Sequence, residues 1–501
     1  LKPSPASVPG PPRRERPPRP RALPRARLRL ACLMARAGPP SGRQPWRGVN
    51  LGGWLLLEPG PSGPLFPSQQ RHSSGAELEC EWSLMQVLRK RRAMGVLTKH
   101  RETFYSKEDF VAIRRCGLNA VRLPFGYWVV LGPGAGEPYE GPALEYVDRA
   151  VAWAEEVGLE VLLDLHGAPG GESGSAPSGR RRDDWHWSHW QFDRSLEALR
   201  VLAQRYRGSR AVTGIAVCNE PSKSVPAEAL CRFYDSAVAA IRGAGMHERQ
   251  VAITLPCFQR DLPEFAQAWA SLSGGRHKNI CFDLHHYYCF GSKANGRSLA
   301  EHLRLIQLRG EEMLRYPVVV GEWSLAIGHT AERAGLRRAD LCRLLARAQV
   351  EAYSRASHGL FFWCWKDRHS IEWSYLDCHA AGLLQAGPAP ELPPWDEEGR
   401  DPLDLALEPM PRSPEVCYGD VVQLRGHNGE FVGVGAGQAP VALSSEPGPR
   451  QQLVLCPGSA RAGGPARRLG AKTAAAAAAW GSPVREGDAV MLLTHNGTFL
   501  A

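Results

Sequence analysis

Residues 214–220 read Gly-Ile-Ala-Val-Cys-Asn-Glu, an apolar run that ends in an amide and a carboxylic acid. A short apolar run without alternation is typical of a strand buried on both faces, as in a parallel sheet covered by helices. The polar pair Asn219-Glu220 then stands at the carboxyl end of this strand. Folds with parallel sheets build their sites at that end. The stretch therefore predicts a fold class and the position of a site.

Similar apolar runs recur along the chain and alternate with helical stretches. The eight strand candidates are 48–55, 119–124, 160–166, 214–219, 251–255, 280–285, 318–322 and 359–365. Helices are predicted between most of them, for example over 143–156, 190–206, 227–242 and 337–354. Eight alternating units favour an α/β fold of the (β/α)8 or TIM-barrel type. A doubly wound open sheet is the alternative, but no Gly-x-Gly-x-x-Gly follows the first strand.

The barrel is assigned to residues 46–381, and the rest of the 501-residue chain differs in composition. Residues 1–45 are rich in Pro and Arg without periodicity, which predicts a disordered tail. Residues 382–413 are interpreted as a linker rich in Pro and acidic residues.

Residues 414–501 contain a weak internal repeat. In each copy, Gly-Asp-Val-Val or Gly-Asp-Ala-Val leads through His-Asn-Gly to a second apolar segment, which predicts a hairpin. The repeat resembles a fascin-like or ricin-like β-trefoil. A complete trefoil does not fit, so we expect a small, incomplete all-β region, either a carbohydrate- or partner-binding accessory or a remnant without a ligand.

The net charge of +10 comes from the N-terminal tail. Residues 1–43 hold eleven Lys or Arg and one acidic residue, so the folded part offers no net basic surface and no nucleic acid is expected. No run of 18 apolar residues occurs, and no membrane span is expected. The 13 cysteines have no spacing typical of a zinc site or a disulfide framework. No sequence pattern indicates an oligomeric state.

Glu220 and Glu322 follow the fourth and seventh strands, whose ends face each other across the mouth of such a barrel. Hydrolysis of a glycosidic bond with retention needs two carboxyl groups about 5–5.5 Å apart, one as nucleophile and one as acid/base. Arg122 and Tyr287 are expected to keep the nucleophile ionised. Asn219 is expected to bind a sugar hydroxyl.

Each of these residues has a commoner structural interpretation when it is taken alone: a helix cap, a solvated loop carboxylate or an ion pair. Their joint occurrence at strand ends favours an active site. Trp363, at the end of the eighth strand, is expected to form the floor under the sugar.

Nine motifs occur in a fixed order between residue 46 and about residue 376. They are Arg47-Gly48-Val49-Asn50-Leu51-Gly52-Gly53-Trp54, Leu57-Glu58-Pro59, Asp109-Phe110, Arg122-Leu123-Pro124-Phe125-Gly126-Tyr127-Trp128, Asp164-Leu165-His166-Gly167-Ala168-Pro169-Gly170, Asn219-Glu220-Pro221, Asp283-x-His285-x-Tyr287, Gly321-Glu322-Trp323-Ser324 and Phe362-Trp363-Cys364-Trp365-Lys366. Together they resemble glycoside hydrolase family 5, in particular its exo-β-1,3-glucanase branch.

The resemblance implies that Glu220 is the general acid/base and Glu322 the nucleophile. It implies a subsite for the reacting glucose lined by Arg122, His166, Asn219, His285, Tyr287 and Trp363. It also implies that Glu58 binds hydroxyls at the non-reducing end and closes the pocket, so that the enzyme releases glucose from the end of β-1,3-glucan. Neither a metal ion nor an organic cofactor is expected.

The loop after Pro169-Gly170 departs from the family pattern. The family often has Gln-Asn-Gly there and an Asp before Ser-Gly, whereas this chain has Glu172-Ser173-Gly174 and Ala176. Charged residues follow at 180–184, and Gly60 stands where a Trp is common. These changes bear on linkage preference and exo action, and they leave the reaction class as it is.

Other functions stay open at this point. Within the enzyme family these are an endo-β-1,4-glucanase and a glycosylceramide hydrolase; outside it, a catalytically inactive glycan-binding protein or a protein that binds nucleic acid through residues 1–43. The family resemblance favours an extracellular or cell-wall location, although residues 28–34 make a poor signal peptide.

Overall fold

The computed structural model describes residues 43–66, 78–332 and 336–384, together with the backbone of six strands between residues 421 and 500. The predicted tail and the predicted linker lie almost entirely outside the described residues and stay predictions. In the part of the chain that is described, no helix combines the length and the apolar character that a membrane span requires.

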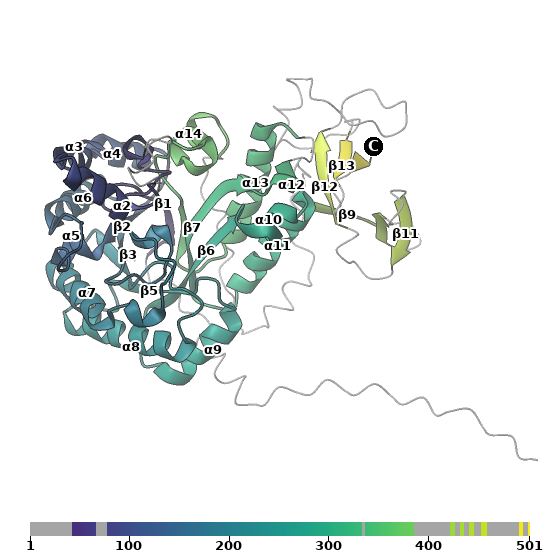
Figure 1. Cartoon of the computed structure of the whole chain (residues 1–501). Coiled ribbons are helices and arrows are strands. Elements are labelled where there is room, and N and C mark those ends of the chain that lie inside the picture. Colours follow the sequence, from purple (N-terminus) through teal and green to yellow (C-terminus); the bar gives the residue numbers. More distant parts are fainter. Residues whose placement is uncertain are drawn as a thin grey trace, which may run out of the picture.

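Eight parallel strands close into a barrel in chain order, which confirms the predicted TIM barrel (Figure 1). The strands are β1 Trp46–Asn50, β2 Ala120–Gly126, β3 Glu160–Gly167, β4 Val212–Ala216, β5 Ala252–Pro256, β6 Ile280–Tyr288, β7 Val318–Ile327 and β8 Gly359–Phe362. The barrel closes between β1 and β8, where Trp46 is in register with Gly359.

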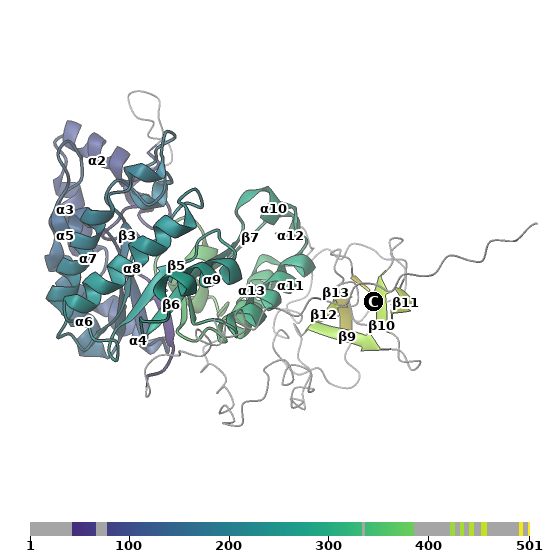
Figure 2. The same ribbon diagram turned by 90° about the horizontal axis from the view of Figure 1, so that it is seen from below.

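Helices surround the barrel on the outside, as the view in Figure 2 shows from below. They are α2 Glu81–Lys90, α3 Gly95–Thr103, α4 Lys107–Arg115, α5 Tyr127–Leu131, α6 Leu144–Val157, α7 Phe192–Tyr206, α8 Ala227–Gly243, α9 Leu262–Ser273, α10 Gly291–Gly296, α11 Leu299–Met313, α12 His329–Glu332, α13 Arg338–Tyr353 and α14 Tyr375–Ala380. Their apolar residues recur at helical spacing: α7 buries Ala198, Leu199 and Leu202 against the core. Helix α6 ends at Gly158, whose positive φ of 72° a residue with a Cβ seldom adopts.

The carboxyl ends of several strands differ from the prediction: β6 and β7 run past it, to Tyr288 and Ile327, and β8 stops short of it, at Phe362. Two further differences, at β1 and β4, concern residues of the site. The first strand was expected to reach residue 55, but β1 ends at Asn50 because the chain turns through Gly53, at a φ of 75°. The fourth was expected to reach Asn219, but β4 ends at Ala216. In both cases the chain leaves the sheet just before the polar residues of the site. The turn after β1 carries Glu58 to the mouth of the barrel.

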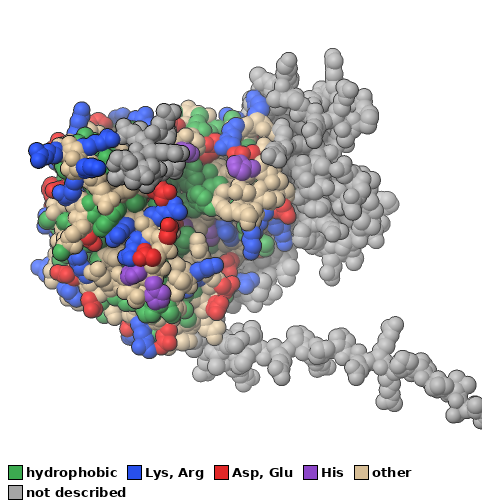
Figure 3. Space-filling model, in the orientation of Figure 1, with side chains coloured by type: hydrophobic (Ala, Val, Ile, Leu, Met, Phe, Trp, Pro, Cys, Tyr) green, Lys and Arg blue, Asp and Glu red, His purple; other side chains and the backbone are tan. Residues whose placement is uncertain are grey.

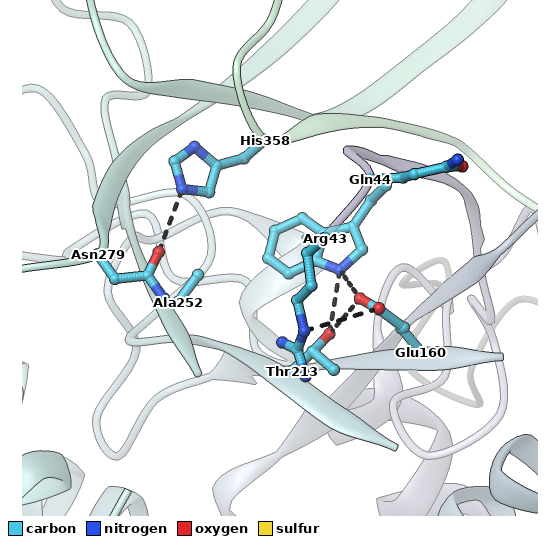
Figure 4. A pocket seen from close by; sticks show the side chains of 8 residues that line it. Arg43, Gln44, Glu160, Thr213, Ala252, Asn279 and His358 are labelled. Atoms are coloured by element: carbon cyan, nitrogen blue, oxygen red, sulfur yellow. Dashed lines mark hydrogen bonds and ion pairs between the residues drawn. The ribbon is translucent and has the colours of Figure 1, made fainter. Parts of the chain in front are cut away.

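The amino-terminal end of the barrel is closed by side chains. A separate apolar cluster fills it from the inside, composed of Trp46, Ala120, Leu162, Ala216, Ala252, Cys281, Val319 and Phe361. Figure 4 shows a pocket next to it, lined among others by Glu160, Thr213, Asn279 and His358. Beside this pocket the indole Nε1 of Trp46 donates to Glu160 at 2.8 Å and to Thr213 at 3.0 Å. This end is therefore a packed floor, and any site opens at the opposite end.

The C-terminal strands form a separate six-stranded sheet in the order β11-β10-β9-β12-β13-β14. They are β9 Val421–Arg425, β10 Phe431–Val434, β11 Pro440–Ser444, β12 Gln452–Pro457, β13 Val490–Leu493 and β14 Phe499–Leu500. The two predicted hairpins correspond to the antiparallel pairs β9–β10 and β13–β14. Their turns lie outside the described residues, and the trefoil assignment stays a prediction.

Candidate active site

Glu220 and Glu322 lie together at the carboxyl end of the barrel. Glu322 is in strand β7, opposite His285 in β6, and Glu220 follows the end of β4. One carboxylate oxygen of Glu220, one carboxylate oxygen of Glu322 and one ring nitrogen of His285 all lie within 4.8 Å of one another. A short separation of the carboxyl groups is typical of retaining glycosidases, whereas inverting enzymes need about 6.5–9.5 Å. The geometry therefore suits double displacement.

Two donors hold the carboxylate of Glu322. Arg122 Nη1 donates to Oε1 at 2.9 Å, and the hydroxyl of Tyr287 donates to Oε2 at 2.7 Å. Burial alone would raise the pKa of Glu322, but the positive charges of His285, Arg122 and His166 outweigh it, and the pKa lies below its ordinary value. Glu322 is ionised, as a nucleophile must be.

Arg122 connects four polar side chains beneath the site. Besides Glu322, its guanidinium donates to Asn50 Oδ1 at 2.8 Å and to Asn219 Oδ1 at 2.9 Å, and it lies 3.1 Å from Asp164 Oδ2. The side chain is fully buried. A buried guanidinium is tolerated only when carboxylates compensate its charge, and here Asp164 and Glu322 do so. Arg122 thus fixes both the carboxylate of Glu322 and the orientation of the Asn219 amide.

His285 lies between the two carboxylates. Its Nδ1 is 2.8 Å from Glu220 Oε1 and 3.4 Å from Glu322 Oε2. Burial lowers the pKa of His285. The charge of Glu322, the hydrogen bond to Glu220 and the charge of Asp283 raise it by more than burial lowers it, so the pKa lies above its ordinary value. Glu220 is the more accessible acid, since its side chain is 15% exposed and that of Glu322 is 5% exposed. A leaving group can therefore reach Glu220.

A second group of side chains adjoins this pair. His166 Nδ1 lies 2.7 Å from Asp164 Oδ2, and its Nε2 is 3.9 Å from Glu58 Oε1. Burial lowers the pKa of His166, but Asp164 and Glu58 raise it to about 9. Glu58 Oε1 is buried and lacks a hydrogen-bond partner among the described residues. That oxygen is suited to accept a hydrogen bond from a hydroxyl of a ligand.

Trp363 presents a buried indole beside this group. Its ring stacks on the imidazole of His166, with centroids 5.4 Å apart and planes 20° apart. Gly52 lies against the indole: a Cβ at Gly52 would be 3.1 Å from Trp363 Cζ2. Glycine here leaves room for the ring. Every residue that the sequence predicted for the site is thus linked to this one mouth, and their catalytic and binding roles stay predictions.

The family model described as cellulase (glycosyl hydrolase family 5) matches residues 92–369. The chain belongs to glycosyl hydrolase family 5. The resemblance inferred from the motifs is confirmed.

Curated relatives agree with this family assignment. A probable glucan 1,3-beta-glucosidase A of Aspergillus niger is 32% identical over 385 residues, covering 68% of this chain and 88% of the relative. The glucan 1,3-beta-glucosidase of Candida oleophila is 30% identical over 376 residues, which cover 68% of this chain and 88% of the relative. The glucan 1,3-beta-glucosidase of Blumeria graminis is 31% identical over 413 residues, which cover 73% of this chain and 94% of the relative.

Among solved structures, the crystal structure of rutinosidase from Aspergillus niger superimposes with a TM-score of 0.56 at 20% identity. The match covers 68% of this chain and 98% of that one. At this identity the likeness concerns the barrel fold of the family 5 domain and nothing more.

The structure adds site residues that the sequence analysis did not single out. Asn50 donates to the carbonyl of Gly321 at 2.9 Å and accepts from Arg122, so it ties β1 to the nucleophile strand. Phe290 is 65% exposed and lies edge-on to Tyr287, with centroids 5.4 Å apart. Trp373 contacts both of these rings. A polar residue in an apolar strand was a usable signal for Asn50, whereas the aromatic pair has no local pattern.

Proposed function

We propose that this family 5 chain is a retaining β-glucan hydrolase that releases glucose from the non-reducing end of β-1,3-glucan. The observation that carries the proposal is the pair Glu220 and Glu322, with His285 between them. One carboxylate oxygen of each acid and one ring nitrogen of His285 lie within 4.8 Å of one another. The relatives from Aspergillus niger and Candida oleophila, named as glucan 1,3-beta-glucosidases, support this choice of substrate.

The proposed reaction is a double displacement. Glu322, ionised and aligned by Arg122 and Tyr287, attacks the anomeric carbon, while Glu220 protonates the leaving oxygen. Glu220 then removes a proton from water, which attacks the glycosyl-enzyme on the face that the leaving group vacated. Retention of configuration at the anomeric carbon follows from the two inversions.

Action at the chain end is proposed from the surroundings of Glu58. Its side chain is 14% exposed, and burial raises the pKa of Glu58 to about 8. A carboxyl group with one unpartnered oxygen beside His166 and Asp367 suits the hydroxyls of a terminal sugar. The proposal is that these polar groups end the site on this side, so that a polymer does not continue past them.

The test is a product assay with a matched variant. Wild type and Glu322→Gln are incubated with laminarin, lichenan and carboxymethyl-cellulose, and the products are separated by size. The proposal expects glucose from laminarin with the wild type and none with the variant. If the products were oligosaccharides instead of glucose, the proposed mechanism would stand and the proposed action at the chain end would be wrong. Absence of products from all three, with glycan binding retained, would leave a binding protein.

Location is a separate proposal. We propose that the protein acts outside the cell or in the cell wall, because its proposed substrate is a polysaccharide. Immunodetection in culture medium, wall and cell fractions tests this, and a signal confined to the cell interior would contradict it.

A further inference from the structure

Glu172 is a fully buried carboxyl group for which the proposed mechanism has no use. It lies in the loop after β3, in the segment that departs from the family pattern. Its carboxylate Oε2 accepts the backbone N–H of Ala168 at 3.0 Å, and its backbone carbonyl accepts the N–H of Ser222 at 3.1 Å. Ala168 is two residues beyond His166, and Ser222 is two residues beyond Glu220. Glu172 therefore joins the two loops that carry these site residues.

The contact at Ser222 is braced from the other side. Arg260 Nη2 donates to the carbonyl of Ser222 at 2.9 Å and to that of Val225 at 2.8 Å. The loop after Glu220 is thus held between Arg260 and Glu172. A displacement of either Arg260 or Glu172 therefore shifts Ser222, which is only two residues from Glu220.

The second oxygen of Glu172 makes this anchor sensitive to protonation. Oε1 is buried and has no hydrogen-bond partner among the described residues. A buried charged oxygen without a partner is costly, so the neutral acid is favoured. Burial raises the pKa of Glu172 to about 7, against the lowering effect of the Ala168 N–H and of His166.

The charged and titratable groups that face Glu172 come from two strands. From β3 these are His166, which favours the ionised form, and Asp164, which opposes it. From the end of β4 comes Cys218, a buried thiol whose pKa Glu172 helps to raise. Ionisation of Glu172 thus places a second negative charge near Asp164, with only one oxygen hydrogen-bonded.

We propose that Glu172 is a positioning residue whose protonation holds the acid/base loop in place, so that the site loses its geometry when Glu172 ionises. The effect on catalysis rests on the proposed function; the effect on the loop does not. Neutral Glu172 keeps the contact between the two loops. The carboxyl group bonds to Ala168 in its own loop, and the backbone carbonyl of Glu172 bonds to Ser222. Ionised Glu172 moves toward water and draws this carbonyl away from the Ser222 N–H.

Catalysis provides the first measurement. The pH profile of kcat/KM on laminarin is compared for wild type and Glu172→Gln, which keeps the shape and an acceptor for the Ala168 N–H but cannot ionise. We expect the alkaline limb to move up by about one pH unit or more in the variant, with kcat at pH 5.5 within about threefold of wild type. An unchanged alkaline limb would overturn the proposal.

Hydrogen exchange provides the second measurement, and it needs no catalysis. Peptides covering residues 166–190 and 219–226 are followed in the unliganded protein at pH 6 and pH 8, corrected for intrinsic exchange. We expect wild type to lose protection in both segments at pH 8 and Glu172→Gln to keep it. Equal protection of the wild type at both pH values overturns the proposal even if the variant does not fold.

Glu81 supplies the control. It is also fully buried with a pKa raised by burial to about 7, but its carboxylate accepts from Leu57 N and Trp128 Nε1, which lie outside both loop segments. Glu81→Gln should leave the pH dependence of segment 219–226 as in wild type. PH-dependent protection without hydrolysis of any glucan would refute the proposed function and keep the role of Glu172.

Discussion

Arg122 Nη1 lies 2.9 Å from Glu322 Oε1, in a part of the barrel where the guanidinium is completely buried. Glu322, the predicted nucleophile, is therefore ionised and aligned before a substrate arrives. The same guanidinium contacts Asn50, Asn219 and Asp164, so one side chain from β2 sets the positions of groups from four other strands or strand ends.

Arg122→Lys tests this arrangement. A lysine has no planar fork and cannot reach Glu322, Asn50 and Asn219 together. We expect kcat to fall by about 100-fold or more, as for loss of one oriented donor at a reacting centre. The free energy of unfolding should fall by about 3 kcal/mol, toward the cost of breaking a buried pair. Laminarin kinetics and urea denaturation measure the two effects, and a variant near wild type in both would contradict the assigned role.

Tyr287→Phe removes the second donor to Glu322. The hydroxyl bond at 2.7 Å favours the ionised nucleophile, so its loss should raise the pKa of Glu322. The acid limb of kcat/KM is then expected to move to higher pH, with kcat lower by about tenfold. Tyr288→Phe is the control, since Tyr288 bonds to Tyr353 and faces away from the carboxylates. An equal shift of the acid limb in Tyr288→Phe would assign the effect to packing and contradict the role of the Tyr287 hydroxyl.

Phe290→Ala tests the exposed aromatic beside Tyr287. A ring that is 65% exposed contributes little to folding but offers a face to a sugar unit beyond the cleavage point. We expect the KM for laminarin oligosaccharides to rise by about fivefold, equivalent to about 1 kcal/mol, with kcat little changed. Leu308→Ala, at an exposed leucine of α11, should change neither constant. A lower kcat at constant KM would show that Phe290 supports Tyr287 instead.

Stability should decline between pH 6.5 and about pH 9. The folded protein raises the pKa of His166 from 6.5 to about 9, so this contribution is complete below pH 6.5 and is lost as pH rises through 9. Glu58 acts in the same direction, since its raised pKa of about 8 favours the neutral acid in the fold. The loss attributable to His166 is about 3 kcal/mol.

Urea denaturation across this pH range measures the decline. His166→Gln should flatten it. His358→Gln is the matched control, because burial lowers the pKa of His358 to about 4 and keeps it neutral throughout. An equal slope in wild type and His166→Gln would contradict the assignment.

The sequence predicted the barrel because strands buried on both faces read as apolar runs, and β3, for example, begins at Glu160 as expected. It placed Glu220 and Glu322 at one mouth because the ends of parallel strands converge. It overestimated the length of β4, since Val217 and Cys218 are as apolar as the strand before them although the chain has left the sheet.

Loop residues could not be predicted in the same way. The orientation of Phe290 and the burial of Glu172 depend on loop conformations that no periodic pattern encodes. Glu172 reads as a solvated loop acid in the sequence, yet the fold surrounds it completely. Its charged neighbours His166 and Asp164 lie on the preceding strand, but whether the loop folds back over them is not encoded in a local pattern, so only the three-dimensional structure reveals its setting.

The position of His285 between the two carboxylates has a consequence for inhibitors. Its imidazole, whose pKa is raised, lies 2.8 Å from one acid and 3.4 Å from the other, so its protonated form is favoured there. A cationic sugar mimic, such as an iminosugar, would present its ammonium to the same two acids and displace the proton of the imidazole into the buffer. Its measured binding enthalpy should therefore vary with the ionisation enthalpy of the buffer, while a neutral lactone mimic should show no such dependence.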